Sequence, residues 1–176
     1  MLKGEKVTLR PMERDDLKRI HEMRQDVELM ILAFGDWQPR PLARLEKDFD
    51  KNLERDEGTW FVIEADGKII GDSGLHGLDR RHGTAELGIG IYEREYLGKG
   101  YGRDTIRAIL KWAFEVQNWR RIWLTTIAPN ERAIRSYLAC GFVEEGRLRQ
   151  HVHYHGEYVD LVQMGLLRSE WEAQQR

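Results

Sequence analysis

The sequence predicts a single α/β domain, residues 1–176, in which a mixed and mostly antiparallel central sheet is flanked by helices. Three observations lead to this fold class. Runs with helical periodicity alternate with β-rich runs along the chain. Two β-rich stretches reverse at Asp66-Gly67, the favoured pair for a two-residue turn, and near His155-Gly156. The 41% hydrophobic content of 176 residues is enough for one core, and no repeat or composition shift marks a linker.

Six elements are expected in the first half of the chain. The alternation in KVTLR predicts a strand, and apolar residues then recur at helical spacing from Leu17 to Met30. The segment GDWQPRP ends that helix, and a second amphipathic helix begins at Leu42. Two β-rich runs and a further strand follow, separated by turns. The expected ranges are 6–10 (strand), 12–30 (helix), 42–58 (helix), 59–78 (hairpin) and 83–92 (strand).

The second half is expected to add two helices and three strands. A glycine-rich loop opens an amphipathic helix that runs to Phe114. A strand, a short helix and a final hairpin follow, which gives the order β-α-α-β-β-β-α-β-α-β-β. Their expected ranges are 121–127 (strand), 130–141 (helix) and 147–167 (hairpin).

Charge and composition exclude several classes of protein. The 28 Lys and Arg residues nearly balance the 30 Asp and Glu residues, so no basic field indicates a nucleic-acid partner. No apolar run is long enough to span a bilayer, so no membrane partner is expected. A single cysteine, Cys140, and a start without an apolar leader indicate a cytoplasmic protein. Cys140 itself is expected to be a small buried residue.

Three glycines within five residues, in the stretch YLGKGYG, come directly before a helix. The start of a helix carries unpaired backbone N–H groups and the positive end of the helix dipole, so it is a natural anion site. Gly98, Gly100 and Gly102 leave the backbone open to a phosphate, and Lys99 and Arg103 add positive charge at the rim. A glycine-rich turn that caps the helix without a ligand is the alternative.

Two common phosphate-binding motifs are excluded at this loop. A P-loop requires Gly-Lys followed by Ser or Thr, whereas Gly98-Lys99 is followed by Gly100. The dinucleotide fingerprint is G-x-G-x-x-G after the first strand of a βαβ unit, whereas this run is G-x-G-x-G after several antiparallel strands. The ligand implied is another phosphate or pyrophosphate compound.

The LGKGYG loop, the helix after it and the later stretch NERAIRSYLACGF resemble the GCN5-related N-acetyltransferase (GNAT) family over nearly the whole chain. The first family motif, whose amides hold the pyrophosphate of acetyl-CoA, is matched here except that Leu97 replaces the usual Arg or Gln. The second motif, N-x-x-A-x-x-x-Y-x-x-x-G-F, is matched throughout. The resemblance implies a sheet splayed beside acetyl-CoA, with no metal. The residues expected to bind the coenzyme are Leu97, Gly98, Lys99, Gly100, Tyr101, Gly102, Arg103 and Asn130.

The flanking sequences are similar to the branch that contains ribosomal-protein N-terminal and spermidine acetyltransferases. This branch implies direct transfer of the acetyl group to a primary amine, which is a protein N-terminus, a polyamine or another small amine. The alternative is an acyl-CoA-binding sensor or partner module without turnover. Formation of a homodimer through the C-terminal strands is also expected.

Acetyl transfer requires a neutral amine, and an amine with a pKa of about 10.4 is only about one part in a thousand neutral near pH 7. Glu86 lies at the same distance from the glycine loop as the general-base glutamate of the histone acetyltransferases in this family. We therefore expect Glu86 to contact the substrate and act as base, directly or through water. Strand alternation places it opposite Leu87. An ordinary solvated carboxylate is the alternative.

The resemblance makes Tyr137 the candidate acid that donates a proton to the departing thiolate, and a core aromatic residue is the alternative. Thr125 stands where ribosomal alanine acetyltransferases carry a glutamate, so no base is expected from that strand. Bulging of the glycine-containing strand LGIGI is expected to turn the N–H group of Ile89 or Ile91 toward the acetyl carbonyl.

Several further residues are candidates for substrate contact or for a metal. Trp37 lies in the break between the first two helices, a region that caps the acceptor site in the family, so it is expected to contact substrate. Negative charge for a cationic amine is available from acidic residues, but such residues are common on surfaces. Alternating histidines in HVHYH are compatible with a metal, yet a hairpin face explains them equally well, and no metal is expected. These acidic residues and histidines are Glu28, Asp36, Asp160, His151, His153 and His155.

Overall fold

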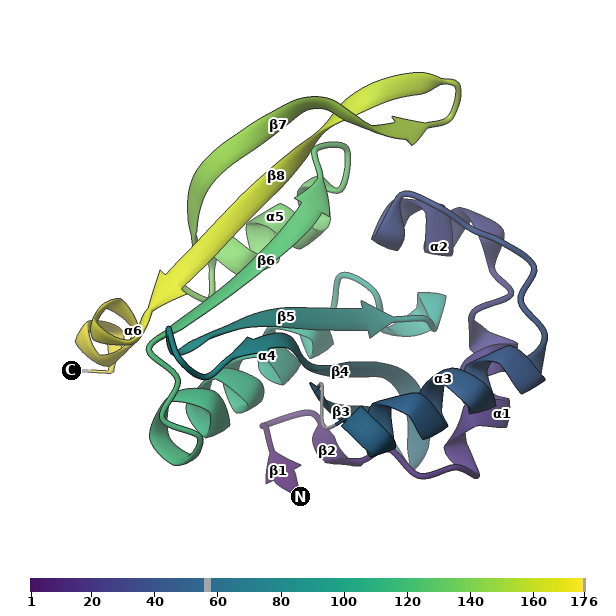
Figure 1. Cartoon of the computed structure of the whole chain (residues 1–176), viewed down its shortest axis with the longest axis horizontal. Helices are drawn as coiled ribbons and strands as arrows, with labels where there is room; N and C mark the ends of the chain where they lie inside the picture. Colours follow the sequence, from purple (N-terminus) through teal and green to yellow (C-terminus); the bar gives the residue numbers. More distant parts are fainter. Residues whose placement is uncertain (56–57, 176) are drawn as a thin grey trace.

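The computed structural model describes residues 1–55 and 58–175. Its strands form one eight-stranded sheet with the order β1-β2-β3-β4-β5-β6-β8-β7 (Figure 1). The elements follow along the chain as β1 (Leu2–Lys3), β2 (Thr8–Pro11), α1 (Asp16–Met23), α2 (Val27–Phe34), α3 (Leu42–Arg55), β3 (Gly58–Ala65), β4 (Lys68–Asp79), β5 (Thr84–Ile91), the 3-10 helix η1 (Arg94–Tyr96), α4 (Tyr101–Lys111), the π-helical turn η2 (Trp112–Val116), β6 (Arg121–Ile127), α5 (Glu131–Leu138), β7 (Val143–Tyr154), β8 (Glu157–Leu167) and α6 (Arg168–Gln174).

The sheet is antiparallel except between β5 and β6. These two strands pair in parallel at three positions only, ending at Glu86 opposite Trp123. Beyond Glu86 they diverge, because β5 continues along β4 while β6 continues along β8 (Figure 1). The mixed, mostly antiparallel and splayed sheet expected from the sequence is confirmed.

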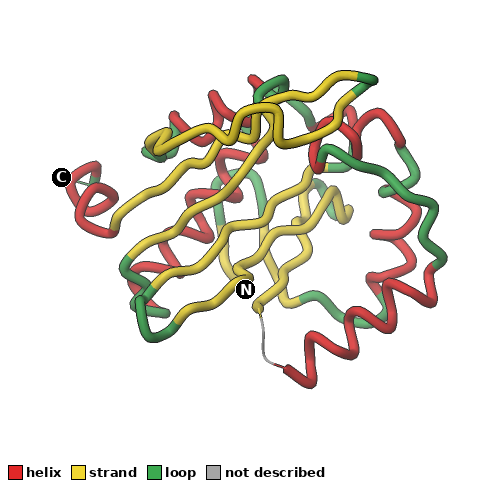
Figure 2. Tube along the Cα trace, turned by 45° about the horizontal axis from the view of Figure 1, so that its top comes forward, coloured by secondary structure: helices red, strands yellow, loops and turns green. Residues whose placement is uncertain are grey.

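Two hydrophobic clusters occupy opposite faces of the sheet. The larger cluster includes Ile106 of α4 together with Leu87 of β5. The smaller cluster joins Ile20 of α1 to Val62 of β3, whereas Ile63, the next residue of β3, belongs to the larger cluster. Figure 2 shows the helices in two groups on separate sides of the strands. Within the described part of the chain, no helix is long and apolar enough to cross a membrane.

Both predicted hairpin turns are confirmed, and each has two residues in the left-handed region. Asp66 and Gly67 have φ values of 50° and 74°, and His155 and Gly156 have φ values of 48° and 85°. Two successive positive φ values are typical of the type I′ turn, whose twist matches that of the strands it connects. The first turn connects β3 to β4, and the second connects β7 to β8.

The single helix predicted over residues 12–30 is wrong, because the chain breaks into α1 and α2 at Arg24. The side chain of Asp26 accepts a hydrogen bond from the backbone N–H of Leu29 and so starts a new helix. Arg94 makes a bidentate ion pair with the same carboxylate, which fixes the junction to η1. The sequence pattern also does not predict β1, η1 or α6, which are short and lack strong periodicity.

The break between α1 and α2 allows Arg24 to reach a buried polar cluster under β4 and β5. Its Nη2 donates to Asp72 Oδ2 at 2.6 Å and lies 3.2 Å from the hydroxyl oxygen of Tyr92. The Tyr92 hydroxyl in turn donates to Asp72 Oδ1 at 3.0 Å. The Asp72 side chain is only 3% exposed, so its charge depends on these two partners.

Replacement of Asp72 with asparagine is expected to destabilise the fold by about 3 kcal/mol, because it leaves the guanidinium of Arg24 without its counter-ion. The matched control is Asp48→Asn, which removes a 36% exposed carboxylate paired with Arg44 and is expected to cost less than about 1 kcal/mol. Urea denaturation measures both free energies of unfolding. Equal losses in the two variants would contradict a special role for the buried cluster.

Candidate active site

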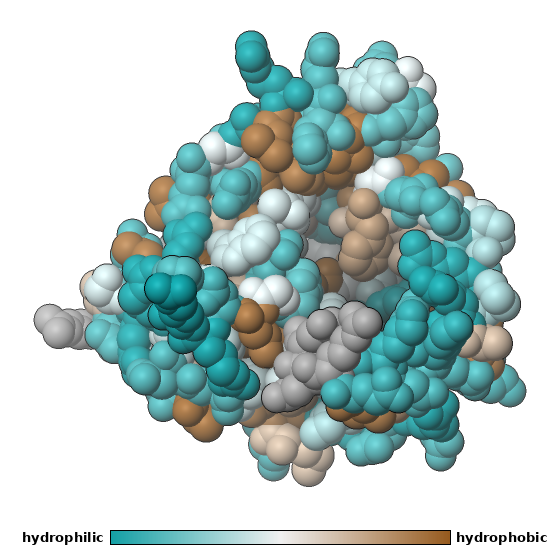
Figure 3. Space-filling view, viewed as in Figure 1, coloured by the Kyte–Doolittle hydropathy of each residue, from teal (hydrophilic) through white to brown (hydrophobic). Residues whose placement is uncertain are grey.

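A cavity of 520 Å³ lies between the end of β5, the glycine-rich loop and the helices α4 and α5. The face shown in Figure 1 is hollowed near its centre (Figure 3). Residues of five segments contribute to the cavity wall: α2, the C-terminal half of β5, the loop before α4, the start of α4, and α5 with its capping residue. The lining residues are Leu29, Ala33, Ile89, Gly90, Ile91, Tyr96, Leu97, Gly98, Gly100, Gly102, Arg103, Ile106, Asn130, Arg132, Ala133, Arg135, Ser136 and Tyr137.

The glycine-rich loop adopts a conformation that side chains disfavour. Gly98 and Gly100 have φ values of 72° and 91°, and α4 begins directly afterwards at Tyr101. A Cβ atom built on Gly98 or Gly102 would meet nothing within 4 Å, so the backbone faces open space there. The loop therefore offers bare amides at a helix start, as an anion site requires.

The N-terminal segment supports this loop from behind, through contacts that the sequence does not predict. The carboxylate of Asp104, in the first turn of α4, accepts the backbone N–H groups of Glu5, Lys6 and Val7 at 2.7–3.0 Å. The Lys6 ammonium donates to the Lys99 carbonyl at 2.9 Å. Both contacts join segments more than 90 residues apart, which explains why no local pattern reveals them.

Positive charge surrounds the cavity as a pyrophosphate would require. Arg103 comes from the start of α4, as predicted, and Arg132 and Arg135 come from α5. The two α5 arginines were missed in the sequence, although their spacing of three residues places them on one helical face. Arg135 also pairs with Glu131 at 3.0 Å on the surface. Bare amides and arginines together fit the diphosphate of acetyl-CoA.

The edge of β5 that lines the cavity has no strand partner beyond Glu86 among the described residues. The Tyr92 N–H donates to the carbonyl of Ile70, so alternation turns the N–H groups of Ile89 and Ile91 away from β4. On that side β6 has already diverged. The bulge predicted in LGIGI is wrong, because the pairing of β5 with β4 is regular from Glu86 to Ile91. The divergence of β6, and not a bulge, leaves these donors without a strand partner in the described part of the chain.

Tyr137 lies at the boundary between the core and the cavity. It is 8% exposed, belongs to the larger hydrophobic cluster and lines the cavity. Burial raises the pKa of its hydroxyl to about 12, so the group remains protonated throughout the neutral range. Tyr137 thus packs in the core and also lines the cavity, and its role as a proton donor stays a prediction.

Glu86 occupies the last paired position before β5 and β6 diverge, on the opposite face from Leu87. Its side chain is 22% exposed, and His76 Nδ1 lies 3.5 Å from Glu86 Oε2. Partial burial raises the pKa of the Glu86 carboxyl, and the charge of His76 opposes that change. Glu86 does not line the cavity described above. The structure therefore does not place Glu86 in the wall of this cavity, and its contact with substrate stays a prediction.

Asn130 performs a structural role within the cavity wall. Its Oδ1 accepts the N–H of Ala133 as the cap of α5, and its Nδ2 donates to the carbonyl of Leu32. The predicted cap is confirmed, and the link to α2 is new. Lys99 and Tyr101, which were also expected to bind the coenzyme, do not line the cavity.

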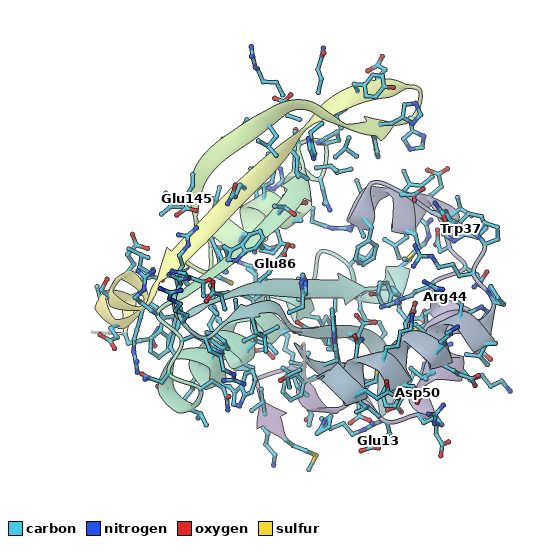
Figure 4. All side chains as sticks on the ribbon, in the orientation of Figure 1. Glu13, Trp37, Arg44, Asp50, Glu86 and Glu145 are labelled. Atoms are coloured by element: carbon cyan, nitrogen blue, oxygen red, sulfur yellow. The ribbon has the colours of Figure 1, made fainter. Side chains whose placement is uncertain are left out.

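Trp37 lies away from these residues, in a second cavity of 410 Å³ beside α1 and α3. Its Nε1 donates to the Arg24 carbonyl at 3.1 Å, and Figure 4 shows it near Arg44 and well separated from Glu86. Asp36 lines the same second cavity. The structure therefore does not bring Trp37 together with the glycine-rich loop, and contact with substrate stays a prediction.

The remaining residues considered for substrate or metal binding make other contacts. His155 lies in the turn after β7 with Glu28 at 3.6 Å, and Asp160 accepts the backbone N–H of Gln150. Among residues 1–55 and 58–175, no group of three potential ligands is arranged to hold a metal ion. Cys140 is buried, as predicted, and burial raises the pKa of its thiol.

The splayed sheet and the glycine-rich loop at the start of α4 enclose a cavity of the kind expected for an acetyltransferase. Residues 6–143 match the family profile described as "Acetyltransferase (GNAT) domain", and the chain belongs to this family. It is an acetyl-CoA-dependent N-acetyltransferase that transfers the acetyl group to a primary amine.

The chain is 32% identical to a spermidine N(1)-acetyltransferase of Vibrio cholerae over 166 residues, which cover 94% of this chain and 95% of that protein. It is 29% identical over 177 residues to the Bacillus subtilis protein YdaF, whose name assigns it provisionally to ribosomal N-acetylation, with 97% and 96% of the two chains covered. The crystal structure of the Vibrio cholerae spermidine N-acetyltransferase with CoA and spermine has a TM-score of 0.88, with 30% identity and coverage of 96% and 99%.

Proposed function

We propose that this enzyme acetylates a primary amine of a linear aliphatic polyamine such as spermidine. The observation that carries this proposal is the position of Glu86, a partly buried carboxylate at the point where the sheet divides. Trp60 and His76 lie on one side of it, and Trp123 is its strand partner on the other. An ammonium group is favoured by a carboxylate with aromatic rings beside it. The spermidine acetyltransferases among its relatives support this choice.

Within this proposal, each residue has a defined task. The amides of the glycine-rich loop together with Arg103, Arg132 and Arg135 hold the phosphates of acetyl-CoA, which supplies the activated acetyl thioester. The free N–H groups of β5 orient the acetyl carbonyl. Glu86 accepts the proton of the amine, directly or through water, and the hydroxyl of Tyr137 donates a proton to the departing thiolate.

The test measures release of the coenzyme A thiol from acetyl-CoA with a panel of spermidine, spermine, an aminoglycoside, free amino acids and N-terminal ribosomal peptides. We expect turnover with spermidine or spermine at a kcat/KM at least about tenfold above that of the other amines. Turnover with the peptides alone would identify a protein N-terminus, and not a polyamine, as the acceptor. Binding of acetyl-CoA with no release across the panel would instead favour the acyl-CoA-binding module.

We also propose that two chains associate through the C-terminal strands. The support for this proposal is the edge strand β7, which is exposed along most of its length and carries the exposed apolar residues Val143 and Leu148. An uncovered edge strand is a ready surface for pairing with another chain.

A further inference from the structure

A row of three side chains crosses β3, β4 and β5 on the face that carries Glu86. His76 and Glu86 are direct partners in the β4–β5 register, so their side chains project from the same face. The ring of Trp60 stacks on His76 with a centroid distance of 5.6 Å and an interplanar angle of 11°. A Cβ atom at Gly88 would lie 3.2 Å from Trp60 and 3.3 Å from His76 Nε2, so the glycine leaves room for the row.

The register places this row at the division of the sheet. Glu86 is paired with His76 on one side and with Trp123 on the other, and it is the last residue of β5 that has both neighbours. Within the row, His76 Nδ1 lies 3.5 Å from Glu86 Oε2. The stacked ring of Trp60 restricts the rotation of that imidazole.

We propose that His76 is a positioning residue for the acetyl transfer, which orients Glu86 and, when protonated, favours the ionised form that accepts the amine proton. This inference rests on the proposed role of Glu86 as base. His76 acts through Glu86 and makes no contact with the reacting atoms.

Among the described residues of the neighbouring strands, His76 is the titratable group that lies beside the Glu86 carboxylate. Two uncharged side chains flank His76 and Glu86, namely Trp60 of β3 and Trp123 of β6. The same face of β6 carries Arg121, but this guanidinium makes a bidentate pair with Glu145 of β7. The His76 side chain is 36% exposed, so it lies at the sheet surface beside the carboxylate.

The first experiment titrates the Glu86 carboxyl by NMR in the full chain and in His76→Gln, and it requires no acceptor amine. Histidine is ordinarily protonated in the acidic range where a glutamate titrates, so it lowers the pKa of a neighbouring carboxyl. The substitution removes that charge, and we expect the pKa of Glu86 to rise by about half a pH unit. An unchanged pKa would overturn the proposal. The matched control is His82→Gln, because His82 pairs with Asp79 in an exposed turn.

The second experiment is a double-mutant cycle of His76→Gln and Glu86→Gln, measured as kcat/KM against pH with the amine selected by the panel. In His76→Gln the acidic limb of the kcat/KM profile is expected to move to higher pH. On that limb kcat/KM is expected to fall about threefold, whereas on the alkaline plateau it is expected to change little. In the Glu86→Gln background the same substitution is expected to have no further effect.

An equal loss at every pH, or the same loss in both backgrounds, would show that His76 only packs against Trp60 and would overturn the proposal. A wild-type rate and pH profile in Glu86→Gln would reject Glu86 as base, and the inference would fall with it. A slow Glu86→Gln variant with an unaltered His76→Gln profile would reject His76 alone.

Discussion

The Glu86→Gln variant is expected to lose about 100-fold to 1,000-fold in kcat/KM for the amine, because glutamine keeps the shape of the side chain but cannot accept a proton. Burial raises the pKa of the wild-type carboxyl, so the wild-type rate falls as the pH falls through that raised value. The acidic limb of the profile is therefore expected to vanish in the variant. Steady-state kinetics from pH 5 to pH 9 measure both effects.

The matched control for this substitution is Glu172→Gln, in α6, which removes a half-exposed carboxylate paired with Arg168. This variant is expected to keep the wild-type rate and pH profile, since α6 contributes nothing to the cavity. If Glu86→Gln were as active as the control, Glu86 would be an ordinary strand carboxylate, the alternative considered from the sequence.

The second large effect is expected for Tyr137→Phe, which removes one hydroxyl from the wall of the cavity. We expect kcat to fall about 100-fold while the KM for acetyl-CoA changes little, because the hydroxyl acts as the thiolate leaves and the ring continues to pack. Because burial raises the pKa of the Tyr137 hydroxyl to about 12, removal of this hydroxyl is not expected to change the shape of the pH–rate profile below pH 9. Steady-state kinetics with varied acetyl-CoA separate kcat from KM.

Tyr158→Phe is the control for this substitution, because Tyr158 is 67% exposed on β8 and lies outside the cavity lining. A rise in KM for acetyl-CoA with an unchanged kcat in Tyr137→Phe would show that the hydroxyl binds the coenzyme and is not the proton donor.

The parts of the fold that depend on local sequence were predicted correctly. The turn at Asp66-Gly67, the Asn130 cap and the strand over residues 121–127 all follow from short-range patterns, and all are confirmed. The break at Arg24 was missed although the Asp26 cap is a local feature, and the contact with Asp72 that the break allows joins residues 48 positions apart. Helical periodicity continues through the break and gives no sign of it.

In the candidate site, too, features set within one strand were predicted from the sequence, whereas features set by the pairing of strands were not. Alternation along β5 was sufficient to place Glu86 on the face opposite Leu87. The partner His76 depends on the register between β4 and β5, and the free edge at Ile89 depends on the divergence from β6. Neither relation is visible within one segment. Trp37 was associated with the acceptor by analogy alone, and the structure places it in a separate cavity.

The most direct test of the account is a crystal structure of the enzyme with coenzyme A and spermidine. We expect the diphosphate on the amides of Gly98 to Gly102, and a primary nitrogen of spermidine within about 2.6–3.2 Å of the Glu86 carboxylate or of one water bound to it. Spermidine bound beside Trp37, with no amine near Glu86, would contradict the assignment of the acceptor site.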